Sequence, residues 1–324
     1  MQYYSDRRKI AIVGAGMVGM SFAYSLVYSH VCDELVIVDI DEKRAEGEAM
    51  DLNHGLAFSG GNMKIYAADY DAISDADIVV ISAGVAQKPG ESRIALLRRN
   101  ARIMASITDS VCKSGFDGIF LIATNPVDIM TDIVRRRSGF PSTRVIGSGT
   151  TLDTARLRYE IGSYFGVDPR NIHAYVMGEH GDSEFVPWSQ AYVSTKSLLS
   201  ICQSDENDFN LSDLNEIERN VRTAAQSIIE AKGATYYGIG LSILRIVRAI
   251  LSNERSILTV SARLEGEYGE DDVYIGVPCL IGREGIKRVV ELDLTPDEID
   301  RFAASADFLR SIRREILRSD VIVQ

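Results

Sequence analysis

The sequence predicts an α/β protein in which a doubly wound parallel sheet is followed by an α+β unit that contains antiparallel strands. Three observations indicate this fold. Short β-branched runs alternate with helical patterns over the first half of the chain, and a glycine-rich turn joins the first run to the helix after it. Near residues 256–281, two longer β-rich runs are separated only by a polar linker. Alternating elements favour a parallel sheet with helices on both faces, whereas strands joined by a short linker favour an antiparallel pair.

The parallel sheet is expected to contain four short apolar strands, at residues 10–13, 35–38, 78–81 and 119–122. A helix is expected after the first strand, because Phe22, Leu26 and Val27 recur at helical spacing. A second helix, after the second strand, carries Ala45 and Ala49 at the same spacing. Ligands of such sheets bind beyond the carboxyl ends of the strands, so the segments that follow these strands are the ones to search for a site.

Beyond about Gly147 the pattern changes, and we expect two domains, at residues 1–147 and 148–324. The second domain should contain helices at 152–161, 214–232 and 241–251, an antiparallel pair at 256–264 and 273–281, and a terminal helix. The terminal helix should begin after Thr295, an N-cap residue that is followed by Pro296 and, three residues on, by Glu298.

Composition excludes several classes of protein. The net charge of −11 argues against a nucleic-acid-binding surface. No apolar run reaches the roughly 20 residues that a membrane span needs, and the first nine residues contain no hydrophobic signal core. Four cysteines lie far apart without C-x-x-C spacing, which is typical of reduced thiols. We therefore expect a cytoplasmic globular protein with no nucleic-acid partner, no membrane partner and no metal.

The first turn carries the most specific motif. Gly14, Gly16 and Gly19 form G-x-G-x-x-G between the first strand and its helix. The first glycine permits a tight turn, the second lets the backbone approach a pyrophosphate, and the third lets helix and strand pack closely. Met17 and Val18 lie at the helix N-terminus, where free N–H groups favour phosphate. This context predicts a Rossmann-type dinucleotide site rather than an ordinary glycine turn.

Asp39 follows the second strand, about 20 residues beyond the last glycine, where a carboxylate can bind the adenosine ribose diol. The same charge repels a 2′-phosphate, so NAD is favoured over NADP. The alternative is that Asp39 merely caps the following segment. Ala83 and Gly84 follow the third strand and belong to the same expected cofactor edge.

His180 is the candidate for proton exchange, because it lies between glycines in Gly178-Glu179-His180-Gly181 and histidine titrates near neutral pH. Asp153 and Arg156 are three residues apart on one helix. They could orient a histidine ring and bind a carboxylate, respectively. Alternatively, the histidine is a structural loop residue and the other two form a surface ion pair.

Two further candidates follow strands. Arg93 ends a loop punctuated by glycine and proline that could close as a lid; the alternative is a solvated arginine at a helix start. Asn125 precedes Pro126 and could donate a hydrogen bond to a ligand, although Asn-Pro also simply marks turns.

These motifs together resemble the bacterial-type L-lactate dehydrogenases of the lactate/malate dehydrogenase family. The matching stretches are VGAGMVG, VDI, AGVAQKPGESR, TNPVD, GSGTTLDTARLR, GEHGDSE and KGATYYGI, and they span nearly the whole chain. The resemblance implies NAD-dependent, reversible reduction of pyruvate to L-lactate.

By this resemblance, His180 exchanges the proton and Asp153 is its partner. Arg156 binds the substrate carboxylate, Arg93 polarises the carbonyl from the closing loop, and Asn125 orients substrate and cofactor. The resemblance also implies a cis peptide bond between Asn125 and Pro126.

Substrate choice is read from two residues. Gln87 stands where malate dehydrogenases carry an arginine for a second carboxylate, and Thr235 stands beside the expected position of a small substrate side chain. Both favour pyruvate, because burying an unpaired carboxylate is costly. Malate dehydrogenase, another L-2-hydroxy acid dehydrogenase, and a non-catalytic structural role are the alternatives.

The family also implies a homotetramer, and many bacterial members are activated by fructose 1,6-bisphosphate. The phosphate site of those enzymes matches Arg158 and His173. Unregulated members carry similar residues, so this match leaves activation open.

Overall fold

The computed structural model describes residues 7–85, 90, 92–204 and 210–317, apart from the side chains of Arg93 and Leu317. Six parallel strands form the first part of the main sheet: β1 (Lys9–Val13), β2 (Glu34–Val38), β3 (Lys64–Ala67), β4 (Ile78–Ile81), β5 (Ile119–Ile122) and β6 (Val145–Gly147). Their spatial order is β3-β2-β1-β4-β5-β6. The chain adds β2 and β3 on one side of β1 and then β4, β5 and β6 on the other side, so the strand order switches between β1 and β4. A dinucleotide binds at this kind of switch point.

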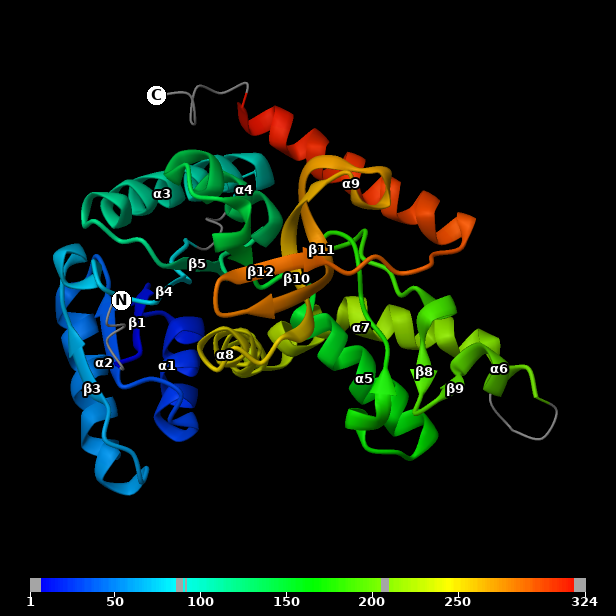
Figure 1. Cartoon of the computed structure of the whole chain (residues 1–324), viewed down its shortest axis with the longest axis horizontal. Coiled ribbons are helices and arrows are strands. Elements are labelled where there is room, and N and C mark those ends of the chain that lie inside the picture. Colours follow the sequence, from blue (N-terminus) through cyan, green and yellow to red (C-terminus); the bar gives the residue numbers. More distant parts are fainter. Residues whose placement is uncertain (1–6, 86–89, 91, 205–209, 318–324) are drawn as a thin grey trace, which may run out of the picture.

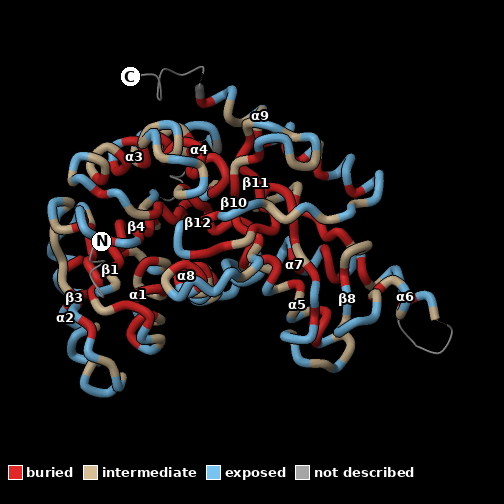
Figure 2. The backbone as a smooth tube through the Cα atoms, in the orientation of Figure 1, coloured by how far each residue is buried: buried red, intermediate tan, exposed pale blue. Residues whose placement is uncertain are grey.

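Helices cover both faces of the parallel strands, as predicted. The described helices are α1 (Met17–Ser29), α2 (Glu42–Gly55), α3 (Arg93–Lys113), α4 (Val127–Ser138), α5 (Thr151–Phe165), α6 (Leu198–Cys202), α7 (Leu211–Lys232), α8 (Tyr237–Leu251) and α9 (Pro296–Leu317). Figure 1 places α3 and α4 above the parallel strands, with α1 and α8 below them. Every residue of β1, β2, β4 and β5 is buried, which explains the run of four apolar residues in each; Figure 2 shows the segments labelled β1 and β4 in the colour of buried residues.

The antiparallel strands extend the parallel sheet. They are β10 (Ser256–Glu265), β11 (Asp271–Gly282) and β12 (Gly285–Val289). β10 runs antiparallel to β6, with Ser261 opposite Gly147, so the nine strands form one sheet. The predicted antiparallel pair is therefore confirmed, but the sequence did not predict its continuity with the parallel strands. A separate small sheet contains β7 (Ile172–His173), β8 (Tyr192–Val193) and β9 (Lys196–Ser197).

The terminal helix α9 begins with the predicted capping box. The N–H of Thr295 donates to Glu298 Oε2 at 2.9 Å, and the N–H of Glu298 donates to Thr295 Oγ1 at 3.4 Å. In the described ranges, no helix is both long enough and apolar enough to cross a membrane.

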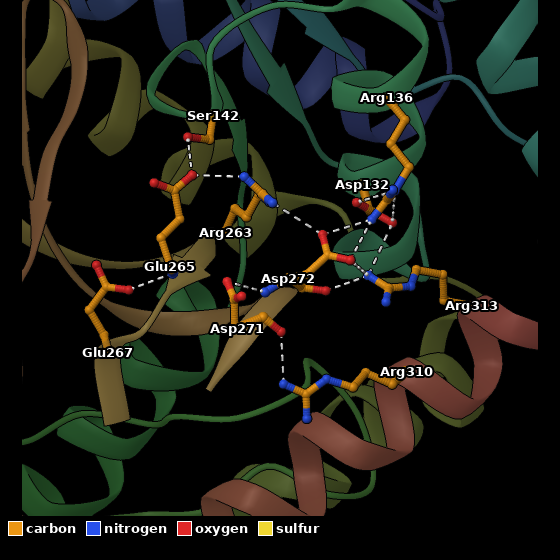
Figure 3. A network of polar contacts seen from close by, with 10 residues as sticks. All are labelled: Asp132, Arg136, Ser142, Arg263, Glu265, Glu267, Asp271, Asp272, Arg310 and Arg313. Carbon is orange, nitrogen blue, oxygen red and sulfur yellow. Dashed lines mark hydrogen bonds and ion pairs between the residues drawn. The ribbon is translucent and has the colours of Figure 1, made fainter. Parts of the chain in front are cut away.

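A network of charged side chains fixes α9 to α4 and to β11 (Figure 3). Both carboxylate oxygens of Asp132 accept from Arg136 Nε at 2.9 Å. Arg136 also donates to Asp272 at 2.9 Å, and Arg313 of α9 lies 3.2 Å from the same carboxylate. Asp132 is buried, so its charge requires these partners. The network thereby holds α4 in place, and the residue one turn before Asp132, Asp128, belongs to the site described below.

Candidate active site and dinucleotide cradle

The glycine turn lies at the carboxyl ends of β1, β2 and β4. Gly14 has φ +110°, and its N–H donates to Val38 O at 2.8 Å. A Cβ on Gly14 would lie 2.7 Å from Ala83 N, and a Cβ on Gly19 would lie 2.2 Å from Gly14 O. Neither position has space for a side chain, so the two glycines bring the turn, β4 and α1 into close contact.

The second glycine instead faces open space. A Cβ on Gly16 would have no neighbour within 4 Å. Gly16 is the N-cap of α1, and no side chain caps this helix end in the described chain. Met17 is 60% exposed, and Val18 follows it in the first turn. This uncapped helix end fits a pyrophosphate, which would accept from its N–H groups.

Asp39 reaches back to the glycine turn. Its Oδ2 accepts from Ala15 N at 2.6 Å, and its Oδ1 accepts from Asp41 N at 2.9 Å. The side chain that caps α2 is that of Asp41, which accepts from Arg44 N at 3.1 Å. The carboxylate of Asp39 lies instead beside the glycine turn, at the carboxyl end of β2.

The neighbouring strand ends complete this edge. Thr124 Oγ1 donates to Ala83 O at 2.8 Å, which ties the segment after β5 to the segment after β4. A Cβ on Gly84 would lie 3.0 Å from the Thr124 methyl. Asn125 is exposed at the end of β5. The predicted cis bond between Asn125 and Pro126 is confirmed.

His180, Asp153 and Arg156 form one hydrogen-bonded group. His180 Nδ1 lies 2.6 Å from Asp153 Oδ2, and Arg156 Nη1 donates to Asp153 Oδ1 at 2.7 Å. The side chains of Asp153 and Arg156 are 2% and 14% exposed. The interpretation of Asp153 and Arg156 as a surface ion pair is therefore wrong, and His180 forms a hydrogen bond with this buried pair.

Two elements position this group. Asp153 and Arg156 lie in the first two turns of α5, which begins directly after β6. The loop that carries His180 is anchored by paired backbone hydrogen bonds between Gly178 and Gly276 of β11. The N–H of His180 donates to Asp128 Oδ2 at 3.0 Å. Because Asp128 is in α4, just after Asn125, this bond connects the histidine loop to the cofactor edge.

The charges of the group support one another. Burial lowers the pKa of His180, but the nearby acids, with Asp153 contributing most and Glu184 and Asp128 less, raise it to about 9. Burial raises the pKa of Asp153, but His180 and Arg156 together hold it below its usual value. At neutral pH the site therefore holds an imidazolium, a carboxylate and a guanidinium, and the imidazolium can give up a proton to a bound substrate.

Two buried acids in this site were missed from the sequence. Asp128 accepts from Ser261 Oγ at 2.5 Å as well as from His180 N, and burial raises its pKa to about 6. Glu184 is also buried, with one carboxylate oxygen within 4.8 Å of side-chain atoms of His180 and Asp153. Both acids end stretches that carry the family resemblance, TNPVD and GEHGDSE, but an acid in the first turn of a helix and an acid in a polar loop are ordinary surface patterns, so no role was assigned to either.

Three predicted substrate residues are placed only in part. Gln87 lies outside the described residues. Arg93 is the first residue of α3, but its side chain also lies outside the described part. Thr235 is half-buried between α7 and α8, and in the described chain no hydrogen bond joins it to His180 or Arg156.

The predicted phosphate residues lie near one another. Arg158 Nε donates to Ala174 O at 3.1 Å, and His173 is the preceding, exposed residue of β7. Arg158 also lines a cavity of about 420 Å³, together with Arg170 and Arg245. It therefore faces a different space from Arg156, because residues two apart on a helix point to different faces.

Comparison with known proteins identifies relatives over almost the whole chain. The NAD-binding domain of the lactate/malate dehydrogenase family matches residues 8–147, and the family's α/β C-terminal domain matches residues 150–319. L-lactate dehydrogenase 2 of Bacillus cereus is 52% identical over 309 residues, which cover 95% of this chain and 98% of the relative. L-lactate dehydrogenase 1 of Bacillus cereus is 50% identical over the same lengths.

Solved structures agree with this relationship. A lactate dehydrogenase from a Medee basin deep-sea metagenome library has 49% identity and a TM-score of 0.93, covering 96% of this chain and 99% of its own. The ligand-bound minor L-lactate dehydrogenase of Enterococcus mundtii has 44% identity and a TM-score of 0.94, covering 96% and 98%. The chain described here belongs to the lactate/malate dehydrogenase family.

Proposed function

We propose that this protein is an NAD-dependent L-lactate dehydrogenase that reversibly reduces pyruvate to L-lactate. The observation that carries the proposal is the buried group of His180, Asp153 and Arg156, connected through Asp128 to the dinucleotide cradle. Relatives named L-lactate dehydrogenase, about half identical over nearly the full length, support the choice of substrate.

Arg156 is positioned to bind the substrate carboxylate. One of its nitrogens is held by Asp153 at 2.7 Å, which fixes the plane of the guanidinium. Its remaining N–H groups can then donate to both oxygens of a carboxylate. This bidentate contact orients a 2-oxo acid so that its carbonyl lies in one defined direction. We assign to Arg93 the polarisation of that carbonyl. We assign to Asn125 a hydrogen bond that orients both substrate and cofactor.

His180 supplies the proton. Its Nδ1 faces Asp153, so the proton for the carbonyl oxygen leaves from Nε2. Bound NADH supplies the hydride in reduction, and NAD⁺ accepts it in the reverse direction. Asp153 holds the ring orientation and stabilises the imidazolium, as the carboxylate does in serine-protease triads. With a pKa of about 9, His180 is protonated at neutral pH, which is the form that pyruvate reduction requires.

An assay of NADH oxidation tests the proposal directly. Purified protein is mixed with NADH and either pyruvate, oxaloacetate or a branched 2-oxo acid, and absorbance at 340 nm is followed. We expect the highest kcat/KM with pyruvate. Higher values with oxaloacetate or a branched acid would assign the chain to malate dehydrogenase or another L-2-hydroxy acid dehydrogenase. NADH binding without turnover of any substrate would indicate a non-catalytic role.

Substrate discrimination is assigned to Gln87 and Thr235. We expect that Gln87→Arg raises kcat/KM for oxaloacetate relative to pyruvate by about tenfold or more, because the new cation can pair with the second carboxylate. The two kcat/KM values, measured side by side, give the ratio. Gln87→Leu is the matched control, since it changes the side chain without adding charge. An unchanged ratio in Gln87→Arg would remove Gln87 from the substrate site.

Cofactor discrimination is assigned to Asp39. We expect the wild type to use NADH at least about tenfold better than NADPH, because a carboxylate beside a 2′-phosphate is a costly like-charge contact. Asp39→Ser should narrow this preference while keeping a hydroxyl for the ribose. The measurement is kcat/KM for each cofactor at saturating pyruvate. Equal efficiency of the wild type with both cofactors would show that Asp39 does not contact the ribose.

We propose a cytoplasmic homotetramer, with a division between dinucleotide and substrate domains at residues 147/148. Large apolar side chains are exposed on two helices that pack together: Tyr24 and Tyr28 on α1, and Tyr237 and Leu241 on α8. An exposed group of this kind is typical of a subunit contact. All four cysteines are free, as is usual in a reducing compartment.

Activation by fructose 1,6-bisphosphate is expected to act through Arg158 and His173. The cavity beside Arg158 is lined by two further arginines and by the exposed Leu241, so a bisphosphate there could join subunits. We expect the bisphosphate to lower the apparent KM for pyruvate, and Arg158→Gln or His173→Ala to abolish this effect without lowering activity at saturating pyruvate. Unchanged wild-type kinetics over a wide range of bisphosphate would show that the site does not regulate the enzyme.

A further inference from the structure

Glu184 is held firmly beside the catalytic group. It lies four residues after His180, and the next residue, Phe185, exchanges two backbone hydrogen bonds of 2.9 Å with Met177. The backbone oxygen of Glu184 accepts from Arg222 Nη2 at 3.0 Å. The segment that follows the histidine loop is therefore bonded both to the segment before the loop, at Met177, and to α7. These bonds fix the backbone from which the Glu184 side chain extends.

Among the residues that the structure describes, none forms a hydrogen bond or an ion pair with the carboxyl group of Glu184. The residue is 5% exposed. Yet one of its carboxyl oxygens lies within 4.8 Å of ring and carboxylate atoms of His180 and Asp153. A buried acid without a partner is costly when ionised, so its presence here calls for a functional explanation.

The charged groups around Glu184 come from three elements. Asp153 and Arg156 face it from α5, His180 from the histidine loop, and Arg222 from α7. Burial raises the pKa of Glu184 to about 8, and the negative charge of Asp153 acts in the same direction. The nearby cations oppose this shift without cancelling it. Glu184 consequently carries its proton at neutral pH and loses it in the range where His180 also begins to titrate.

We propose that Glu184 is a positioning residue that sets the pH range of His180. With its proton, it is neutral and leaves Asp153 and the more distant Asp128 as the acids that balance the imidazolium. Without its proton, it becomes an additional counter-charge that keeps His180 protonated as the medium turns alkaline. This inference rests on the proposed role of His180 as proton donor, and it adds a residue to which the family resemblance assigned no role.

Glu184→Gln tests the proposal, because glutamine has the shape of the protonated acid but cannot ionise. At pH 7 the variant should keep kcat/KM for pyruvate within about twofold of the wild type. Above pH 8 it lacks the second counter-charge, so His180 should deprotonate about one pH unit earlier, which lowers kcat/KM for pyruvate about fivefold at pH 9. Lactate oxidation, which needs neutral His180, should begin at a correspondingly lower pH.

Direct titration of His180 provides a readout that does not depend on turnover. The chain has four histidines, so ring signals in a ¹³C-histidine-labelled sample are few, and His180→Asn identifies the signal of interest. The His180 signal should titrate at lower pH in Glu184→Gln than in the wild type. A purely structural role of Glu184 would lower thermal stability without moving this titration.

Glu179→Gln is the matched control. Glu179 is an equally buried acid of the same loop, but its carboxylate accepts from Ser183 Oγ at 2.5 Å, and it is not among the main causes that raise the pKa of His180. Its replacement should leave both pH profiles in place. Superimposable profiles of Glu184→Gln and wild type would overturn the proposal for Glu184. Retained activity in His180→Asn would instead overturn the proposed function, so the two failures are distinguishable.

Discussion

Replacing Asp153 by asparagine is expected to lower kcat/KM for pyruvate by about 10³–10⁴-fold at pH 7, the order of loss seen when a histidine in an active site loses its carboxylate partner. Asparagine keeps the shape of the side chain but removes the charge that lies 2.6 Å from His180 Nδ1. It also removes the counter-ion that holds Arg156 at 2.7 Å. One substitution therefore impairs both the proton donor and the residue that binds the carboxylate.

The pH dependence of this variant has a definite sign. In the wild type, Asp153 makes the largest contribution to raising the pKa of His180 to about 9, with smaller contributions from Glu184 and Asp128, against the opposing effect of burial. Without the charge of Asp153, only the smaller contributions oppose burial, so the imidazole should lose its proton at lower pH than in the wild type. Residual pyruvate reduction should consequently go on rising toward lower pH than wild-type activity does. The measurement is kcat/KM over pH 5.5–9.5.

Asp132→Asn is the control for structural damage. Asp132 is an acid of similar burial whose carboxylate binds Arg136 at 2.9 Å, but it lies in the network that anchors α9 (Figure 3). Its replacement should lower the Tm while leaving the pH profile of kcat/KM in place. If Asp153→Asn keeps activity within tenfold of the wild type at pH 7, Asp153 is not the partner of the proton donor.

The elements of the fold were predictable where local patterns suffice. Strands β1, β2, β4 and β5 are buried along their whole length, so each contains an unbroken run of four apolar residues in the sequence. β3 was not predicted, because only one of its four residues, Ile65, is buried. β6 has only three residues and was also missed. Its pairing with β10, which makes the sheet continuous, depends on chain folding over more than 100 residues and leaves no local pattern.

The polar groups that form the centre of the site could be predicted from the sequence, but the buried acids around them could not. His180, Asp153 and Arg156 were candidates because of their residue types, the family resemblance assigned their roles, and the structure brings the three together. Asp128 and Glu184 were missed because charged residues are most often exposed, and burial is a property of the folded chain. Their raised pKa values arise from that burial, so no spacing in the sequence could have indicated them.

Replacing Arg156 by lysine should lower kcat/KM for pyruvate by about 10³-fold while leaving the pH dependence close to that of the wild type. Lysine keeps the positive charge beside Asp153, so the electrostatic support of His180 persists. Its single ammonium cannot bind Asp153 and both oxygens of a substrate carboxylate in one plane. The lost charge-assisted hydrogen bond costs about 1.5–3 kcal/mol, and the resulting misorientation of the carbonyl accounts for the further loss.

Separate measurements of binding and turnover check this result. The KM for pyruvate should rise steeply and kcat should fall, while the Kd for NADH, followed by quenching of the fluorescence of the one tryptophan, Trp188, should stay within about twofold. Arg158→Lys is the matched control, because Arg158 lies on the same helix but faces the cavity with Arg245 rather than Asp153. It should leave KM for pyruvate unchanged in the absence of bisphosphate. If Arg156 binds the substrate carboxylate, losing its planar guanidinium must weaken substrate binding. A KM in Arg156→Lys equal to that of the wild type would therefore mean that the carboxylate is bound elsewhere.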